Sequence, residues 1–160
     1  MKKLTLIIPA KNESESLPSV LDELKIYNLN INIILQESDI STIRSVENYP
    51  VNLIYQDNKG YGDALIKGIE TCTTDYFSIF NADGSFNPSE LKTMLFYIEK
   101  DNYDFVFGSR YQKNSGSEDD TIITLIGNYI FTWIGRFIFN LNISDILYTF
   151  VVGKTDKAKN

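Results

Sequence analysis

Short apolar runs alternate with helical patterns along the first two thirds of the chain. Five runs have the length and composition of buried strands, and they lie at 4–8, 30–35, 51–55, 76–80 and 104–107. Because neighbouring parallel strands must be joined by a crossover, usually a helix, this alternation indicates helices on both faces of a parallel sheet. The sequence therefore predicts an α/β fold, a three-layer αβα sandwich with a mostly parallel central sheet.

The connecting segments carry recognisable helix signals. Ser14 or Ser16 can cap the first helix, and Pro18 suits its first turn. A weaker helix is predicted at 41–48, and Pro88 suits the first turn of a later one. Apolar side chains fall on one face of the first and last of these helices, namely Leu17, Val20, Leu21, Leu24, Leu91, Met94, Leu95 and Ile98. Residues 144–152 read as a further strand, followed by a polar tail at 153–160.

Length and composition exclude several classes of protein. A chain of 160 residues suits a single domain. With 15 Lys and Arg against 21 Asp and Glu, the net charge is −6, and without a basic cluster we expect no nucleic-acid partner. The absence of histidine excludes histidine triads and histidine metal sites. The single cysteine, Cys72, allows no internal disulfide and is expected to be a small buried residue at a helix end. The N-terminus enters a strand without a cleavage signal, so a cytoplasmic location is expected.

The segment 75–85 carries the first candidate site. A buried strand rises to Phe80 and breaks into a polar turn with Asn81, Asp83 and Ser85. In extended backbone, residues i and i+2 point the same way, so Asn81 and Asp83 can face one cation. Mg²⁺ and Mn²⁺ bind through a few protein oxygens together with substrate phosphates. The alternative is an ordinary β-turn, since Asn, Asp, Gly and Ser are all turn residues.

Polar residues follow the other strands as well. The loop 59–62 contains Gly-Tyr-Gly and opens a helix, where a phosphate or ribose can bind the helix N-terminus. Asn12, Glu13 and Glu37 follow the first two strands, and there they can bind a ribose and base. Arg110 follows the fifth strand as a candidate phosphate contact. Each of these features also has a simpler explanation. The loop 59–62 can be a turn at a helix start without a ligand. Asn12, Glu13 and Glu37 can be solvated loop residues, and Arg110 can form a surface ion pair.

The last third of the chain changes character. Residues 112–120 form a polar loop that we expect to be flexible, and 121–143 is strongly apolar with Arg136 as its only charge. That length would just span a bilayer, but Asn128, Thr132, Arg136 and Asn140 make a poor spanning helix. Two interpretations are favoured over spanning. One is a helix lying on a membrane surface or docking on a partner, and the other is an ordinary buried helix of this domain.

Taken together, these motifs resemble the family 2 glycosyltransferases with the Rossmann-like GT-A fold, and most closely the dolichyl- or polyprenyl-phosphate sugar transferases. The matching segments occur in the family's order at 7–13, 58–68, 80–85, 108–111 and 143–145. The resemblance implies a nucleoside-diphosphate sugar bound by Pro9, Ala10, Asn12, Glu13, Glu37, Asn58, Gly62, Ala64, Asn81, Ala82 and Asp83. It implies a divalent metal, Mg²⁺ or Mn²⁺, at Asn81, Asp83 and Ser85, and catalytic roles for Asp83, Arg110 and Asp145.

The resemblance also implies a reaction and a location. The expected chemistry is metal-assisted inverting displacement at the anomeric carbon, with a polyprenyl phosphate as acceptor and Asp145 as candidate base should the acceptor be a hydroxyl. Residues 1–111 would bind the nucleotide sugar. Residues 121–160 would belong to the acceptor-binding part of the enzyme, which is incomplete in this sequence, and 121–143 would lie on the cytoplasmic face of the membrane. The resemblance is also compatible with assembly into a homo-oligomer.

Three departures from the family pattern keep other functions in view. Asn81 replaces the first acid of the metal motif, 36–41 matches the family poorly, and family members continue beyond the position of Asn160. A catalytically impaired relative that binds a nucleotide or a membrane partner is therefore the first alternative. A nucleotidyltransferase is the second, although the loop after the first strand lacks the glycines that such enzymes carry.

Overall fold

The structure, a computed structural model, describes residues 3–110 and 122–160, and for 122–125 it describes the backbone alone. The chain divides into two compact units. The first comprises Met1–Val106 and Val151–Asn160, and the second comprises Phe107–Phe150. The predicted loop at 112–120, together with Tyr111, lies outside the described residues.

A six-stranded sheet forms the centre of the first unit, in the order β3-β2-β1-β4-β6-β5. Its strands are β1 (Leu4–Pro9), β2 (Asn30–Leu35), β3 (Asn52–Tyr55), β4 (Tyr76–Ile79), β5 (Phe105–Phe107) and β6 (Val151–Lys154). β1 pairs in parallel with both β2 and β4, and β2 pairs in parallel with β3. β6 runs antiparallel to β4. The prediction of a mostly parallel sheet is therefore confirmed.

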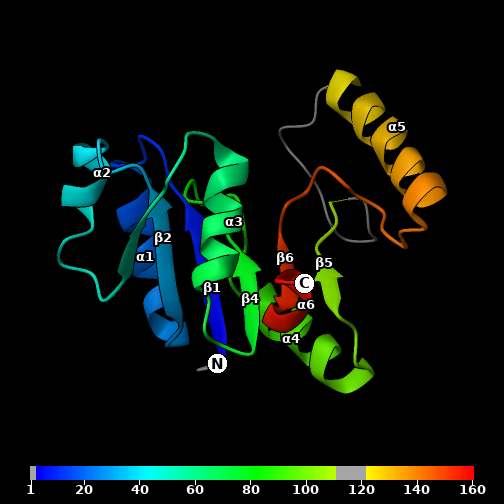
Figure 1. The fold of residues 1–160 in the computed structure, drawn as a ribbon, viewed down its shortest axis with the longest axis horizontal. Coiled ribbons are helices and arrows are strands. Elements are labelled where there is room, and N and C mark those ends of the chain that lie inside the picture. The colour runs from blue at the N-terminus through cyan, green and yellow to red at the C-terminus, as the bar shows by residue number, and fades with distance from the viewer. Residues whose placement is uncertain (1–2, 111–121) are drawn as a thin grey trace. The chain divides into compact units, whose positions relative to one another are not determined.

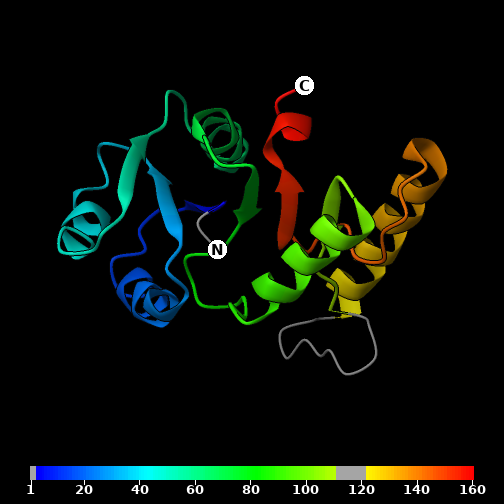
Figure 2. The same ribbon diagram turned by 90° about the horizontal axis from the view of Figure 1, so that it is seen from below.

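Helices cover both faces of this sheet, as Figures 1 and 2 show. On one side lie α3 (Tyr61–Thr71) and the short α6 (Thr155–Ala158); on the other lie α1 (Leu17–Leu24) and α4 (Glu90–Asp101). A 3₁₀ turn, η1 (Lys25–Tyr27), extends α1, and α2 (Ile40–Ser45) follows β2. The predicted three-layer αβα sandwich is present.

Burial explains why these segments became strands and helices. Leu4, Leu6, Ile7 and Ile8 of β1 are fully buried, as expected of a central parallel strand covered on both faces. The four predicted apolar residues of α1 are all buried, and so are Leu91, Met94 and Ile98 of α4. Cys72 is buried at the C-terminal end of α3, as predicted.

Ser16, one of the two predicted caps, occupies the N-cap of α1, and Pro18 lies in the first turn as predicted. The hydroxyl of Ser16 donates to Glu13, however, and makes no capping bond to the helix. Other predicted boundaries were wrong. Pro88 precedes α4, which begins at Glu90 with Ser89 as its N-cap.

The boundary in the C-terminal region was also wrong. Of the predicted strand at 144–152, only Val151 and Val152 belong to β6, and 144–150 is an irregular segment in which the side chain of Asp145 makes polar contacts. The expected polar tail instead supplies the last half of β6 and then α6.

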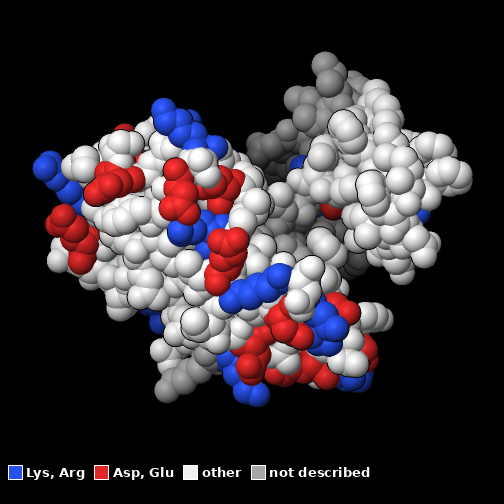
Figure 3. All heavy atoms as spheres, viewed as in Figure 1, with Lys and Arg blue, Asp and Glu red and all other residues white. Residues whose placement is uncertain are grey.

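The second unit contains one helix, α5 (Ile122–Phe139), among its described residues. The interpretation of an ordinary buried helix is wrong, because large apolar side chains along α5 are exposed: Ile126, Tyr129, Ile130, Phe131, Trp133, Phe137, Ile138 and Phe139. The surface over α5 is almost free of charge (Figure 3). Within the described residues, no helix combines the length and apolar character that crossing a bilayer requires.

Candidate functional site

Three loops of the first unit follow adjacent parallel strands. The loop 10–13 follows β1, 36–39 follows β2 and 81–85 follows β4. Because these strands are parallel neighbours, their carboxyl ends lie at one edge of the sheet, where open α/β sheets bind ligands. The predicted gathering of strand-end polar residues is therefore confirmed.

Asp39 ties the first two loops together. Its Oδ2 accepts a hydrogen bond from the backbone N–H of Asn12 at 2.7 Å, and its Oδ1 caps α2 through the N–H of Thr42. Asn12 needs this support because it adopts a left-handed conformation, with φ of 60°. Burial acts to raise the pKa of Asp39, but the hydrogen bonds from Asn12, Thr42 and Ser41 outweigh it and lower that pKa.

The N-terminus of α3 forms the second wall of the site. Gly60 has φ of 118°, which L side chains rarely adopt, so glycine is required where the loop turns into the helix. Gln56 donates from Nε2 to the carbonyl of Gly60 at 2.9 Å and holds the turn. Asn58 donates from its backbone N–H and its side chain to Asp63, in the first turn of α3. Asn58 therefore supports the helix start.

The Asn81–Ser85 turn is closed by its own hydrogen bonds. The N–H of Ser85 donates to Asp83 Oδ1 at 2.9 Å, and Asn81 donates from Nδ2 to Ser85 Oγ, also at 2.9 Å. Gly84 has φ of 80°, so the turn reverses at a position that favours glycine. Phe80 and Phe86 are buried at either side and pack edge to face. The turn is thus anchored in the core while Asp83 and Ser85 are exposed.

The turn's oxygens fit a metal only in part. Among the described residues, no group of three or more acidic or cysteine side chains is placed to hold an ion. Asp83 offers one carboxylate, of which Oδ1 is already engaged, and Asn81 adds a neutral amide oxygen. This donor set fits a hard divalent cation whose remaining ligands are phosphate oxygens and water.

A pocket of about 440 Å³ opens where these loops meet. This volume falls in the range of small-molecule sites. Of the residues predicted to bind the donor, seven line it: Pro9, Ala10, Glu13, Ala64, Asn81, Ala82 and Asp83. The pocket does not include Asn12, Glu37, Asn58 or Gly62 among its lining residues. Asn12 and Asn58 instead support the loops, and Glu37 is exposed on the turn that Asp39 anchors.

Sequence reasoning missed several lining residues. Lys11, Gln36, Gln56 and the stretch 59–61 also line the pocket. The 59–61 stretch belongs to the glycine-bearing loop singled out above, and Lys11 and Gln36 lie in strand-end segments. Gln56 follows β3, and no other feature of the sequence indicated that it would line the pocket. Lys11 and Lys59 bring positive charge to a pocket whose acids are Glu13 and Asp83.

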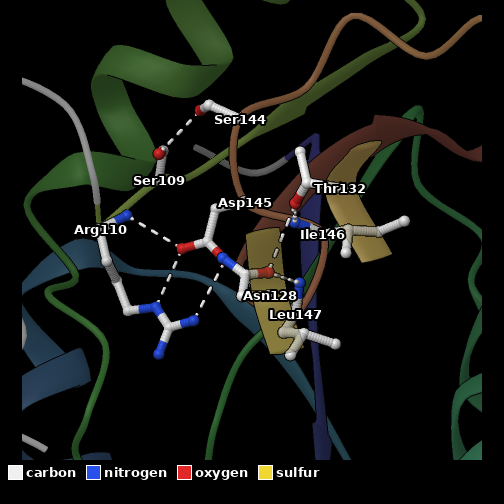
Figure 4. A network of polar contacts seen from close by, with 8 residues as sticks. All are labelled: Ser109, Arg110, Asn128, Thr132, Ser144, Asp145, Ile146 and Leu147. Atoms are coloured by element: carbon white, nitrogen blue, oxygen red, sulfur yellow. Dashed lines mark hydrogen bonds and ion pairs between the residues drawn. The ribbon is translucent and has the colours of Figure 1, made fainter. Parts of the chain in front are cut away.

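A polar network in the second unit joins the other two predicted catalytic residues (Figure 4). Arg110 donates from Nε to Asp145 Oδ2 at 2.9 Å and from Nη2 to Oδ1 at 3.1 Å. Its backbone N–H also reaches Oδ2, at 3.2 Å. The amide of Asn128, on α5, donates to Oδ1 at 2.8 Å. The Asp145 side chain is fully buried, whereas that of Arg110 is 24% exposed.

This geometry makes Asp145 a poor base. Burial acts to raise the pKa of Asp145, but hydrogen bonds from Arg110 and Asn128 and the arginine charge lower it below its ordinary value. A general base works best with a pKa near the working pH and within reach of the substrate proton. Asp145 is better suited to holding Arg110 than to accepting a proton.

Comparison with known proteins places the chain in a family. The model of the family described as "Glycosyl transferase family 2" matches residues 5–159. Dolichol-phosphate mannosyltransferase of Pyrococcus furiosus is 31% identical over 127 residues, which cover 73% of this chain and 36% of that protein. UDP-N-acetylglucosamine--dolichyl-phosphate N-acetylglucosaminyltransferase of Methanococcus voltae is 25% identical over 149 residues, covering 79% of this chain and 59% of that protein. This chain therefore spans less than two thirds of the length of either relative.

Solved structures share the fold. Mannosyl-3-phosphoglycerate synthase from Rubrobacter xylanophilus superposes with a TM-score of 0.74 at 16% identity, covering 96% of this chain and 53% of that one. Glucosyl-3-phosphoglycerate synthase from Mycobacterium tuberculosis, in complex with Mn²⁺, UDP and glucosyl-3-phosphoglycerate, gives 0.76 at 11% identity, covering 97% and 57%. At these identities the likeness concerns the fold alone, and it confirms the expected GT-A architecture.

Proposed function

We propose that this chain, which belongs to glycosyl transferase family 2, binds a nucleoside-diphosphate sugar and passes the sugar to a lipid phosphate. The observation that carries the proposal is the pocket at the carboxyl ends of β1, β2 and β4. It combines the residues of the first-strand loop, the N-terminus of α3 and the Asn81–Ser85 turn. Three of the matched segments, 7–13, 58–68 and 80–85, thus contribute residues to one pocket.

The pocket offers complementary chemistry for a diphosphate. Gly60 and Tyr61 place the positive end of the α3 dipole at the pocket, where an anion is favoured. Lys11 and Lys59 add two cationic side chains that can neutralise phosphate charge. Gln36 offers its amide group, and Gln56 its amide oxygen, for hydrogen bonds with a ribose or base, since Nε2 of Gln56 donates to the carbonyls of Asn58 and Gly60.

A divalent cation, Mg²⁺ or Mn²⁺, would be held by Asp83, Asn81 and the donor's phosphates. When bound, it would supply Lewis-acid stabilisation of the leaving diphosphate. Structural relatives with Mn²⁺ and UDP support this assignment by analogy of fold. Because Asn81 is neutral, the chain contributes one carboxylate, and the two pocket lysines take a larger share of the charge balance.

The acceptor proposal rests on the relatives and on the second unit. Two relatives carry dolichol phosphate or dolichyl phosphate in their names. Arg110 is held rigidly by Asp145 and has a partly exposed guanidinium, a suitable partner for a phosphate monoester. A phosphate nucleophile is already anionic, so the displacement needs no base, which agrees with the lowered pKa of Asp145.

We further propose that α5 lies on a membrane surface. Its exposed aromatic and aliphatic residues would enter the headgroup region, and Arg136 at the same helix would contact lipid phosphates. Trp133 and Phe137, which are 59% and 78% exposed, stack on each other at 5.5 Å. Liposome co-sedimentation should therefore fall sharply in a Trp133→Ser/Phe137→Ser double variant, and equal binding by both proteins would contradict the surface role.

Donor binding is tested by thermal shift with UDP, GDP and their sugars, with and without Mn²⁺. We expect one diphosphate nucleotide to raise the Tm in a metal-dependent manner, and Asp83→Ala to abolish the metal dependence. Asp101→Ala, which removes an exposed carboxylate at the end of α4, is the matched control and should behave as wild type. No nucleotide effect in any combination would refute the donor site.

One observation favours a second candidate function. Because Asn81 leaves the metal turn with a single carboxylate, a protein that binds the donor without turning it over is the alternative. Sugar transfer to a short isoprenyl phosphate separates the two functions. Metal-dependent nucleotide binding without product would favour the binding protein, and restoration of product by Asn81→Asp would locate the defect in the turn.

A further inference from the structure

Helix α5 buries two polar side chains on a surface that is otherwise mostly apolar. Asn128 is 2% exposed and Thr132 is 6% exposed. They lie four residues apart, one above the other on the same face of the helix. Burial of an amide in a helix interior is unfavourable unless its donors and acceptors are satisfied. The contacts of these two residues therefore indicate what this face of α5 does.

Both residues bind the segment 145–147. Asn128 accepts from the N–H of Leu147 at 3.1 Å, and Thr132 accepts from the N–H of Ile146 at 3.2 Å. One turn further along the helix, a side chain at Gly135 would stand only 2.9 Å from Ile146 Cδ1, so helix and segment approach closely there. Figure 4 shows the two hydrogen bonds from Leu147 and Ile146. Two hydrogen bonds and a close approach thus fix the backbone of 145–147 against α5.

Asn128 differs from Thr132 in one contact. Its Nδ2 donates to Asp145 Oδ1 at 2.8 Å, the same oxygen that receives Arg110 Nη2 at 3.1 Å. The backbone N–H and Nε of Arg110 both bond Oδ2, so without Asn128 the only one of these bonds left on Oδ1 would come from Nη2 of the same arginine. Because the terminal torsion of a carboxylate is broad and two-fold, Oδ1 and the guanidinium could then move together about Oδ2. A donor from a third side chain removes that freedom, because Asn128 is itself fixed by Leu147.

We propose that Asn128 is a positioning residue that fixes the plane of the Asp145 carboxylate and, through it, the orientation of the Arg110 guanidinium. Through the carboxylate, its amide connects α5 to the arginine that would bind the acceptor phosphate. A role of Asn128 in sugar transfer therefore rests on the proposed function. A planar guanidinium binds phosphate through a fixed fork of N–H groups, so its orientation decides how well the phosphate is held. Thr132 supports the segment without reaching the carboxylate.

The first test needs no ligand. The Nε–H of Arg110 is followed by ¹⁵N NMR on the full chain, with the resonance assigned by its loss in Arg110→Lys. In Asn128→Ala, loss of a hydrogen bond to a charged group should speed solvent exchange of this proton about tenfold. Thr132→Val is the matched control, because it removes the buried hydrogen bond to Ile146 and leaves the Asn128–Asp145 bond in place. It also removes the long hydrogen bond of 3.5 Å that Thr132 Oγ1 donates to Asn128 Oδ1, so it tests at the same time whether loosening Asn128 alone affects Arg110.

The two variants together separate positioning from general stability. Faster exchange in Asn128→Ala with wild-type exchange in Thr132→Val supports the inference. Unchanged exchange in Asn128→Ala, or an equal increase in both variants, overturns it, since the effect would then be absent or would follow from loosening of the segment. Should Asn128→Ala not fold, Asn128→Ser removes the amide with a smaller change in side-chain polarity and is measured in the same way.

A second readout concerns the proposed acceptor. Farnesyl phosphate is titrated into wild type and both variants, and UDP is titrated in parallel as a probe of the pocket in the first unit. Positioning predicts an increase of about tenfold in the Kd for farnesyl phosphate in Asn128→Ala only, with the Kd for UDP unchanged. If wild type does not bind farnesyl phosphate, the acceptor assignment fails, while the exchange rate of the Arg110 proton still decides the role of Asn128.

Discussion

Because Asp145 forms a buried ion pair with Arg110, we expect Asp145→Asn to lower the free energy of unfolding strongly. The substitution keeps the shape of the side chain but removes its charge. It also replaces one acceptor oxygen by an NH₂ group, which then faces donors from Arg110 or Asn128. The comparison is Asp104→Asn, which alters the pair between Lys154 and Asp104 at 3.0 Å, where the aspartate side chain is 50% exposed.

The expected magnitudes differ because the burial differs. Removing one partner of a fully buried pair costs about 3–5 kcal/mol. Arg110 is 24% exposed and can regain some water, so we expect about 2–4 kcal/mol for Asp145→Asn. The exposed pair should contribute no more than about 1 kcal/mol.

The assay is urea unfolding followed by the fluorescence of Trp133, the only tryptophan of the chain, which lies on α5 and so reports on the second unit. Far-ultraviolet circular dichroism, recorded on the same samples, follows the secondary structure of the whole chain. An Asp145→Asn variant that loses no more stability than Asp104→Asn would refute the reasoning, because burial would then not govern the strength of the pair.

The lowered pKa of Asp145 adds a pH dependence with a definite sign. A carboxyl group whose folded pKa lies below its unfolded value stabilises the fold above the unfolded pKa, near the ordinary value of 3.8. That contribution is lost as the pH falls through the lowered folded value. The stability difference between wild type and Asp145→Asn should therefore be constant near neutrality and shrink below about pH 4. A difference that grows on acidification would show that the sign is wrong.

Three further predictions concern the first unit. Gly68→Ala should destabilise the chain by about 1–3 kcal/mol in urea, because its Cβ would stand 2.3 Å from Ile7 Cγ2, whereas Gly62→Ala meets nothing within 4 Å and should be neutral or slightly stabilising. Equal effects in both variants would refute the close approach of α3. Asp39→Ala should cost about 1 kcal/mol as a lost helix cap and should weaken UDP binding, measured by calorimetry, through loosening of the first loop. Lys59→Ala should weaken UDP binding about tenfold yet leave uridine binding unchanged, and equal losses for both ligands would contradict a phosphate contact.

Most of the fold was predictable because its signals are local and mutually consistent. β2 has the predicted limits, Asn30–Leu35, since a β-branched run bounded by polar residues leaves little ambiguity. The C-terminal region was not predictable in the same way. β6 inserts between β4 and β5, a pairing over about 75 residues of sequence that no local pattern encodes. Gly153 is required there because a side chain would stand 2.6 Å from Phe105 Cδ1, a constraint visible only in three dimensions.

In the candidate site, too, the residues with local signals were predictable, and those that depend on tertiary contacts were not. Residues placed directly by a strand end, such as Pro9, Asn81 and Asp83, were found because parallel strands bring their carboxyl ends together. The family resemblance implies a role for Glu37, but Asp39 follows the same strand, and only the tertiary hydrogen bond from Asn12 shows that Asp39 joins the two loops. The surroundings of Asp145 are likewise not visible in the local sequence. Its burial and its arginine partner, 35 residues away, decide its pKa.

The hydrogen bond from the N–H of Gly108 to the carbonyl of Phe150, at 2.8 Å, has a consequence for modularity. The two ends of the stretch between Gly108 and Phe150 therefore lie next to each other, as in an inserted segment. Insertions whose two ends lie close together can be exchanged with little cost to the host. Replacing that stretch with a short turn should leave the sheet and the pocket of the first unit in place. Under the proposed function, grafting other modules between Gly108 and Phe150 would change what receives the sugar.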